Sequence, residues 1–136
     1  MSFRFTYPTP LRWVDIDSEG VVNNAVYLSL MEQARYGYFT MLGHMRDGKV
    51  PFVLAEATVR FHKPGRIGME VVTKARTSHL RNSSFGMEYE IHGGSVLLAS
   101  GTAALVYVDA AFVPVPIPAD VRAAIAAFEG IADRTA

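Results

Sequence analysis

The spacing of hydrophobic and polar residues changes several times along the chain, and each change predicts a different element. The first segment, from about Phe3 to Trp13, alternates aromatic and polar residues as a half-buried strand does. Pro8 and Pro10 interrupt it. Because proline cannot donate a hydrogen bond to a neighbouring strand, we expect this strand to lie at a sheet edge or to be irregular.

From Asn24 to about Leu42 the apolar residues recur at intervals of three and four, which predicts a helix. Asn23 or Asn24 suits its N-terminal cap, and Gly43 suits its C-terminal end. The polar stripe on this helix is narrow, so most of its circumference must be covered. Arg35 falls on the covered side and should need a carboxylate or carbonyl partner.

Four strand-like segments follow, at about residues 53–63, 69–78, 83–91 and 96–108. Gly93-Gly94 is typical of a two-residue hairpin, and the other connections are also short. We therefore expect an antiparallel meander whose concave face is filled by the long helix. The first of these segments alternates strictly, with one face expected to be apolar: Val53, Ala55, Ala57, Val59 and Phe61.

Pro118 begins a short terminal helix in which Val121, Ile125 and Phe128 share a face. The predicted fold is α+β: one domain, residues 1–136, with about five antiparallel strands wrapped around one long helix. Such a sheet has two edges, and its apolar faces exceed what one helix covers, so we expect a homodimer or homotetramer.

The composition excludes several other classes of protein. Half of the residues are hydrophobic and 19% are charged, which is incompatible with disorder. A formal net charge of zero argues against a surface built for nucleic acid or anionic lipid. The chain has no cysteine, and no apolar run approaches the roughly 20 residues that span a bilayer. These features favour a soluble, cytoplasmic protein without a membrane or nucleic-acid partner.

The segment from Arg12 to Asn24 carries the most chemistry. It holds three carboxylates, at Asp15, Asp17 and Glu19, and leads into the start of the predicted helix. Free N–H groups and the positive end of the helix dipole gather there and can stabilise an oxyanion. A carboxylate in this loop could act on a carbonyl as base or nucleophile. Alternatively, the acids only shape a turn. The four histidines are isolated in sequence and are better explained as surface residues than as metal ligands.

The run D-I-D-S-E-G-V-V-N-N-A-V-Y-L-S-L-M-E-Q-A-R, residues 15–35, resembles the signature of the 4-hydroxybenzoyl-CoA thioesterase family of the hotdog fold. The later V-R-F-H-K-P-G-R, R-N-S-S-F and P-I-P-A-D-V-R-A-A segments are also similar to that family. The resemblance implies an acyl-CoA thioesterase that releases a free acid and coenzyme A. It implies no cofactor, because a thioester carbonyl is already a good electrophile.

The same resemblance implies roles for particular residues. Asp17 corresponds to the carboxylate that attacks the thioester or activates water, and the backbone N–H of Asn24 to the group that polarises the carbonyl. On this reading Asp15 orients the loop or pairs with Arg35. The pair formed by Glu32 and Arg35 has a structural role. The substrate-binding residues that it implies are Gly20, Asn23, Tyr27, Lys63, Arg66, Ser83 and Ser84.

Several alternatives remain open. Tyr27 can equally belong to the core. The sequence has one local basic cluster: Arg60, His62, Lys63 and Arg66, with Arg81 on a nearby turn. It either binds the phosphates of coenzyme A across a subunit boundary or is a solvated strand face. Many relatives carry a histidine after the glycine or at the helix start, where this chain has Val21 and Asn24, so a histidine-assisted version of the thioesterase mechanism is not expected. A hotdog hydratase or dehydratase is disfavoured because residues 1–43 contain no histidine. A non-catalytic module that binds acyl-CoA or an acyl carrier protein is the main competing function.

Overall fold

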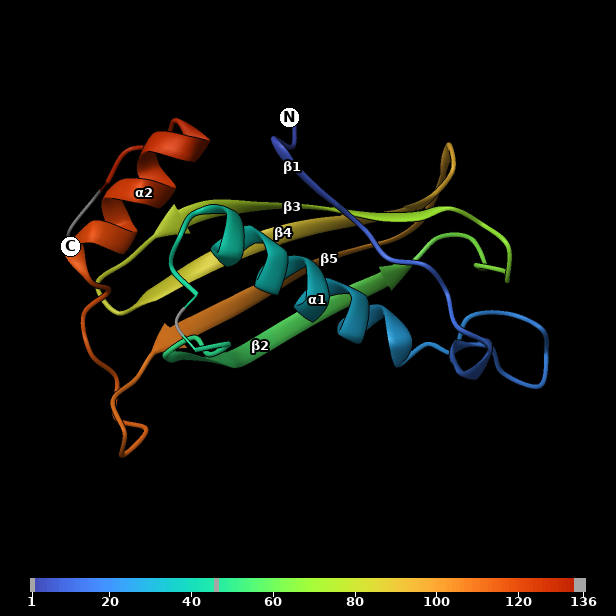
Figure 1. Cartoon of the computed structure of the whole chain (residues 1–136), viewed down its shortest axis with the longest axis horizontal. Coiled ribbons are helices and arrows are strands. Elements are labelled where there is room, and N and C mark those ends of the chain that lie inside the picture. The colour runs from blue at the N-terminus through green and yellow to red at the C-terminus, as the bar shows by residue number, and fades with distance from the viewer. Residues whose placement is uncertain (1, 46, 134–136) are drawn as a thin grey trace.

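A computed structural model describes residues 2–45 and 47–133. Five strands and two α-helices, with one short 3₁₀ helix, make up this part of the chain (Figure 1). In chain order they are β1 (Phe5–Pro8), η1 (Trp13–Asp15), α1 (Val26–Met41), β2 (Phe52–Phe61), β3 (Val71–Leu80), β4 (Ser84–Gly93), β5 (Val96–Tyr107) and α2 (Ala119–Glu129). The predicted α+β class and five-stranded antiparallel sheet are confirmed.

The strands form one antiparallel sheet in the order β1-β3-β4-β5-β2. The meander that we expected holds only for β3, β4 and β5. The prediction was wrong for β2, which pairs with β5 at the far edge of the sheet instead of with β3. The reason is that residues 62–70 cross from one side of the sheet to the other and do not close a hairpin. β1 is the opposite edge, as Pro8 and the nearby Pro10 predict.

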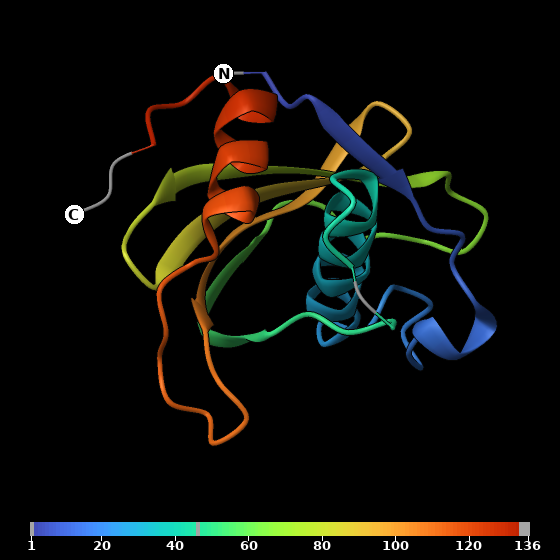
Figure 2. The same ribbon diagram turned by 60° about the vertical axis from the view of Figure 1, so that its left-hand side comes forward.

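Helix α1 lies in the concave face of the curved sheet (Figure 2). It begins at Val26, two residues later than predicted, because Asn23 first forms a turn: its carbonyl accepts from the Val26 N–H at 2.9 Å and its side chain accepts from the Ala25 N–H at 3.0 Å. It ends near Gly43, whose φ of +79° suits a residue without a side chain. Such differences of one or two residues at helix ends are common.

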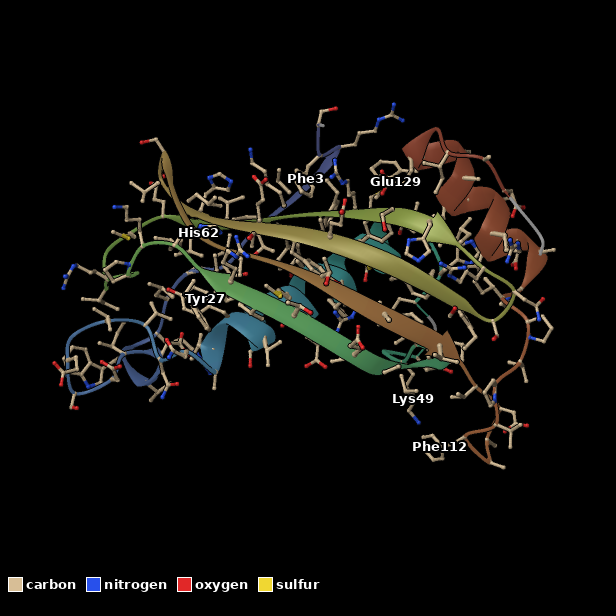
Figure 3. The ribbon with its side chains drawn as sticks, turned by 180° about the vertical axis from the view of Figure 1, so that it is seen from behind. Phe3, Tyr27, Lys49, His62, Phe112 and Glu129 are labelled. Carbon is tan, nitrogen blue, oxygen red and sulfur yellow. The ribbon has the colours of Figure 1, made fainter. Side chains whose placement is uncertain are left out.

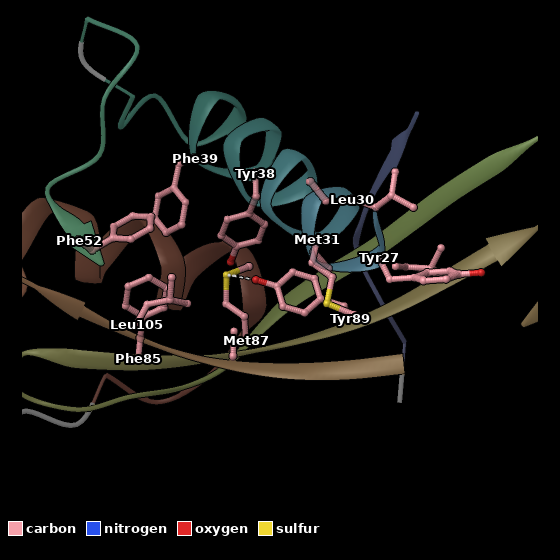
Figure 4. Packing of buried hydrophobic residues seen from close by; sticks show 14 of the residues in the cluster. Tyr27, Leu30, Met31, Tyr38, Phe39, Phe52, Phe85, Met87, Tyr89 and Leu105 are labelled. Carbon is pink, nitrogen blue, oxygen red and sulfur yellow. Dashed lines mark hydrogen bonds between the residues drawn. The ribbon is translucent and has the colours of Figure 1, made fainter. Parts of the chain in front are cut away.

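The core fills the space between α1 and the sheet, and Figure 4 shows its packing. Aromatic rings dominate one end, where the Phe39 and Phe52 centroids lie 4.9 Å apart and both rings approach Phe85. The inward residues of β4 are those that the alternation predicts: Phe85, Met87, Tyr89 and Ile91, each at most 1% exposed. The Gly94-Ser95 turn that joins β4 to β5 lies one residue beyond the predicted pair.

Strand β2 departs from the strict alternation. A bulge between Leu54 and Glu56 shifts the register against β5. An extra residue of this kind reverses which side chains face inward, so Phe52 is buried while Val53 is 36% exposed. The prediction that Val53 and Ala55 face the core was therefore wrong. Most of β2 is exposed because no other strand covers its outer edge.

Helix α2 packs against β3 beside the C-terminal end of α1. Pro118 occupies its N-cap rather than its first turn, and Val121 and Ile125 are buried as predicted. The Glu129 carboxylate accepts from the Tyr38 hydroxyl at 2.7 Å and from the Thr77 N–H at 2.8 Å. Within residues 2–45 and 47–133 no helix is long and apolar enough to span a bilayer.

Candidate active site

The loop between β1 and α1 is anchored by an ion pair at its beginning. The Asp15 carboxylate accepts from the Arg12 side chain at 2.9 Å and from the Arg12 backbone N–H at 2.8 Å. The Arg12 guanidinium holds the pKa of this buried carboxyl below its ordinary value. Asp15 therefore orients the loop, which is one of its two expected roles, and does not pair with Arg35.

Asp17 lies two residues later in a tight turn. Its Oδ1 accepts from the Glu19 N–H at 2.9 Å and from the Val21 N–H at 3.3 Å, and its own N–H donates to the Val21 carbonyl at 2.8 Å. Gly20 closes the turn with a φ of +80°, which only glycine adopts readily. The side chain is partly exposed, and its Oδ2 has no hydrogen-bond partner among the described residues. One oxygen is thus held by the backbone and the other is available.

The start of α1 follows directly. The Asn23 N–H donates to the Asp15 carbonyl, which ties the helix start to the anchored part of the loop. The Asn24 N–H, two residues before α1 begins, meets no acceptor among the described residues, and Asn24 is exposed. A free N–H at a helix start is a suitable donor for a developing oxyanion.

A close contact joins this loop to the segment after β2. The Val22 N–H donates to the Gly65 carbonyl at 2.8 Å, and a side chain at Gly65 would meet Val22 at 2.9 Å and the Tyr27 hydroxyl at 3.0 Å. Tyr27 itself is 3% exposed and packs its ring against Phe61, with centroids 5.5 Å apart. Burial raises the pKa of its hydroxyl. In this single chain Tyr27 occupies the core.

The other expected binding residues divide into two groups. Lys63 and Arg66 are exposed on either side of Gly65, and so lie beside the Asp17 loop. Ser83 and Ser84 lie at the opposite end of the sheet, where Ser84 pairs with Val106. Figure 3 shows the two ends, with Tyr27 and His62 at one and Lys49 and Phe112 at the other.

Arg81 also lies at the distant end, in the turn between β3 and β4, so the expectation that it neighbours the other basic residues was wrong for a single chain. The reason is again topological. β3 leads the chain away from Arg66 over its full length before the turn is reached.

Arg35 is buried, as its place on the helix predicts, but without the carboxylate or carbonyl partner that we expected. Its Nη1 donates to the Tyr89 hydroxyl at 2.8 Å. Sequence reasoning missed this partner because Tyr89 lies 54 positions away and looks like any inward aromatic of its strand.

Two large cavities lie away from Asp17. One of about 880 Å³ is enclosed by Phe52, Tyr107 and the 108–112 loop, and one of about 560 Å³ lies between α1 and the start of β2. Asp17 and Asn24 line none of the five cavities described for the chain. In the described part of the chain, three or more acidic or histidine side chains nowhere gather as metal ligands would.

Comparison with known proteins places this chain in a family. A sequence model of the thioesterase superfamily matches residues 19–100, which include Asn24, β2 and Lys63. An acyl-CoA thioesterase of Haemophilus influenzae is 24% identical over 126 residues, which cover 88% of this chain and 93% of that protein.

A chloroplastic acyl-acyl carrier protein thioesterase of Arabidopsis thaliana is 31% identical over 121 residues, or 82% of this chain. The match spans only 62% of that longer relative. A crystal structure of a thioesterase from Thermus thermophilus, complexed with coenzyme A and zinc, is 35% identical. It superposes with a TM-score of 0.86 and covers 96% of this chain and 98% of its own. Because the family model matches more than half of its length, this chain belongs to the thioesterase superfamily.

Proposed function

We propose that this protein hydrolyses acyl thioesters of coenzyme A, with Asp17 as the reacting carboxylate and the Asn24 N–H as the oxyanion donor. The observation that carries the proposal is the pairing of one available carboxylate oxygen, on Asp17, with an unoccupied N–H at the start of α1 a few residues later. Relatives named as acyl-CoA thioesterases support the substrate class.

Two routes fit these groups. Asp17 can attack the thioester carbon, expel the thiolate and leave an anhydride that water cleaves. Alternatively, it takes a proton from a water molecule, which then attacks the same carbon. On either route the carbonyl oxygen becomes negative and the Asn24 N–H stabilises it. The products are the free acid and the thiol, and one water molecule is consumed.

The open edge of the sheet supports a homo-oligomeric site. Within the described residues β2 pairs with β5 alone, and apolar side chains along it are exposed, including Leu54 at 47% and Phe61 at 50%. A second copy that pairs antiparallel with this edge would bring the Phe52 end of one chain towards the Asp17 loop of the other. Ser83 and Ser84 would then approach a reacting centre from which they are remote in a single chain.

Lys63 and Arg66 suit the phosphates of coenzyme A within the same proposal. Both are exposed beside the Asp17 loop, and Ser100 already engages the neighbouring His62 at 2.8 Å. Two cations next to the reacting carboxylate would hold an anionic nucleotide while its thioester enters the site. A cytoplasmic location belongs to the proposal as well, and cell fractionation tests it.

The test is thiol release from a panel of acyl-CoA esters by the purified protein. We expect Asp17→Asn to lower kcat by at least about 100-fold, since such a variant loses the reacting group. Glu19→Gln, which removes an exposed acid from the same loop, is the matched control and should keep wild-type activity. Light scattering of the wild-type protein tests the oligomer, and a monomer that is fully active would contradict the shared site.

Further results would distinguish the two routes from each other, and catalysis from binding alone. Single-turnover hydrolysis in oxygen-18 water labels the Asp17 carboxylate on the nucleophilic route and leaves it unlabelled on the general-base route. Equal activity of Asp17→Asn and wild type would refute the assignment. A wild-type protein that binds acyl-CoA without releasing thiol would instead be the non-catalytic binding module.

A further inference from the structure

The guanidinium of Arg35 is a buried charged group that the proposed mechanism does not use. The residue is 7% exposed in the middle of α1, and its polar and ring contacts are with one side chain: the Tyr89 hydroxyl at 2.8 Å and the Tyr89 ring, 6.0 Å from the centroid. That hydroxyl in turn donates to the Met87 sulfur at 3.4 Å. No carboxylate among the described residues forms an ion pair with Arg35.

The other buried arginine shows what a structural pairing looks like in this fold. Arg122 is 4% exposed, and its guanidinium meets the Asp133 carboxylate at 2.7 Å and donates to the Arg81 carbonyl. Removing a charge from water is costly unless a counter-charge and hydrogen bonds replace the water. Arg122 has both. Arg35 has one neutral hydroxyl for five N–H donors, so most of its hydrogen-bonding capacity is unused.

Arg35 forms part of the wall of two cavities that together make a groove between α1 and β2. The smaller, about 130 Å³, begins at Leu28, and the larger, about 560 Å³, continues to Met45 and Phe52. They share three residues: Glu32, Arg35 and Leu54. The groove therefore begins about one helical turn beyond Asn24 and passes Arg35. Its remaining walls are mostly apolar, as in typical ligand pockets.

Glu32 is the other charged residue that both cavities share. It precedes Arg35 by one turn of α1, but it is exposed at the rim while Arg35 is buried. Water screens a rim carboxylate far more effectively than a buried guanidinium. The electrostatic character of the groove's inner part is therefore positive.

We propose that Arg35 binds a carboxylate at the far end of the acyl chain, and that dicarboxylic acyl thioesters are the preferred substrates. This inference rests on the proposed function of Asp17 and Asn24. Arg35 lies eleven positions after Asn24, most of them in α1, which corresponds to a rise on the order of 16 Å along the axis. Because helical side chains lean towards the N-terminus, an acyl chain of roughly eight carbons spans the gap.

The experiment compares suberyl-CoA with octanoyl-CoA, which have the same chain length and differ in the terminal carboxylate. For the wild type we expect kcat/KM to be higher for suberyl-CoA by about 10-fold or more, because Arg35 forms a charge-assisted hydrogen bond with the terminal carboxylate. Arg35→Met should abolish this preference while octanoyl-CoA is still cleaved. Arg35→Lys should keep part of it. Glu32→Gln, the matched control in the same groove, should keep or increase the preference for suberyl-CoA.

A second measurement separates ligand binding from a structural role and from catalysis. Free suberate should raise the Tm of the wild type and of Asp17→Asn, but not that of Arg35→Met. Without ligand, Arg35→Met should melt no lower than the wild type, because an unpaired buried charge is replaced by an apolar side chain. If no acyl-CoA is cleaved, the proposed function fails while the suberate shift still decides the role of Arg35.

Three results would overturn the inference. The first is an unchanged suberyl-to-octanoyl ratio in Arg35→Met. The second is the absence of a suberate shift in the wild type. The third is dissociation of the oligomer by both Arg35→Met and Glu32→Gln, which would show that these residues serve an interface between copies and not a ligand.

Discussion

The two ends of α1 are built in opposite ways. At its N-terminal end, the loop that carries Asp17 is held by short polar turns, the Arg12–Asp15 ion pair and backbone hydrogen bonds. At its C-terminal end, aromatic rings from α1, β2, β4 and β5 pack with centroids 4.9 to 5.9 Å apart. Packing of that density contributes most of the stability of a core, whereas polar turns position groups at little energetic gain. The proposed chemistry and most of the core packing therefore lie at opposite ends of one helix.

The largest effect that this comparison predicts is on stability. Phe85 is 1% exposed and contacts the rings of Phe39, Phe52 and Tyr107. Phe85→Ala should lower the free energy of unfolding by about 3–5 kcal/mol, because it leaves a cavity among rings that cannot collapse. Urea denaturation measures the loss. At a temperature where the variant is folded, kcat should match that of the wild type. A parallel fall in kcat would contradict separate roles for the two ends of α1.

A smaller effect is expected at Gly20, and it should fall mainly on activity instead of stability. A side chain there would meet no atom within 4 Å, so the cost of Gly20→Ala comes only from its φ of +80°. That cost is about 1–2 kcal/mol and falls on the turn that orients Asp17. We expect kcat to fall by a larger factor than the modest change in Tm suggests. Gly94→Ala, at φ +60° in the distant β4–β5 turn, is the control and should change Tm without changing kcat.

The smallest predicted effect depends on pH. The pKa of Asp15 is lowered in the folded protein by Arg12, so its ionised form favours folding. This contribution is present above the ordinary carboxyl pKa and is lost as the pH falls through the lower folded value. Asp15→Asn should therefore cost about 1 kcal/mol at pH 7 and progressively less towards pH 3. Urea titrations at both pH values check this, and a difference that grows on acidification would contradict it.

Much of the fold could be predicted because it depends on local pattern. The period of α1, the prolines of β1 and the inward residues Phe85 to Ile91 all follow from constraints on neighbouring residues. The bulge in β2 could not be predicted in this way, since nothing in Leu54 or its neighbours signals an extra residue. Strand order was missed for the same reason, because pairing partners are chosen by the whole sheet and short connections do not dictate them.

Local sequence was enough to indicate the candidate chemistry: an acid-rich loop, a helix start and a motif of fixed spacing in which Asp17 precedes Asn24 by seven positions. It did so because these groups are close along the chain, where backbone geometry limits their separation. Only the tertiary structure decided that Asp15 belongs to Arg12, that Ser83 and Arg81 lie at the far end of the sheet, and that Arg35 faces a groove with Tyr89 as its partner. Some of these contacts are between residues that are distant in sequence, and in others one of several candidate partners is selected. Both depend on how the sheet closes around α1.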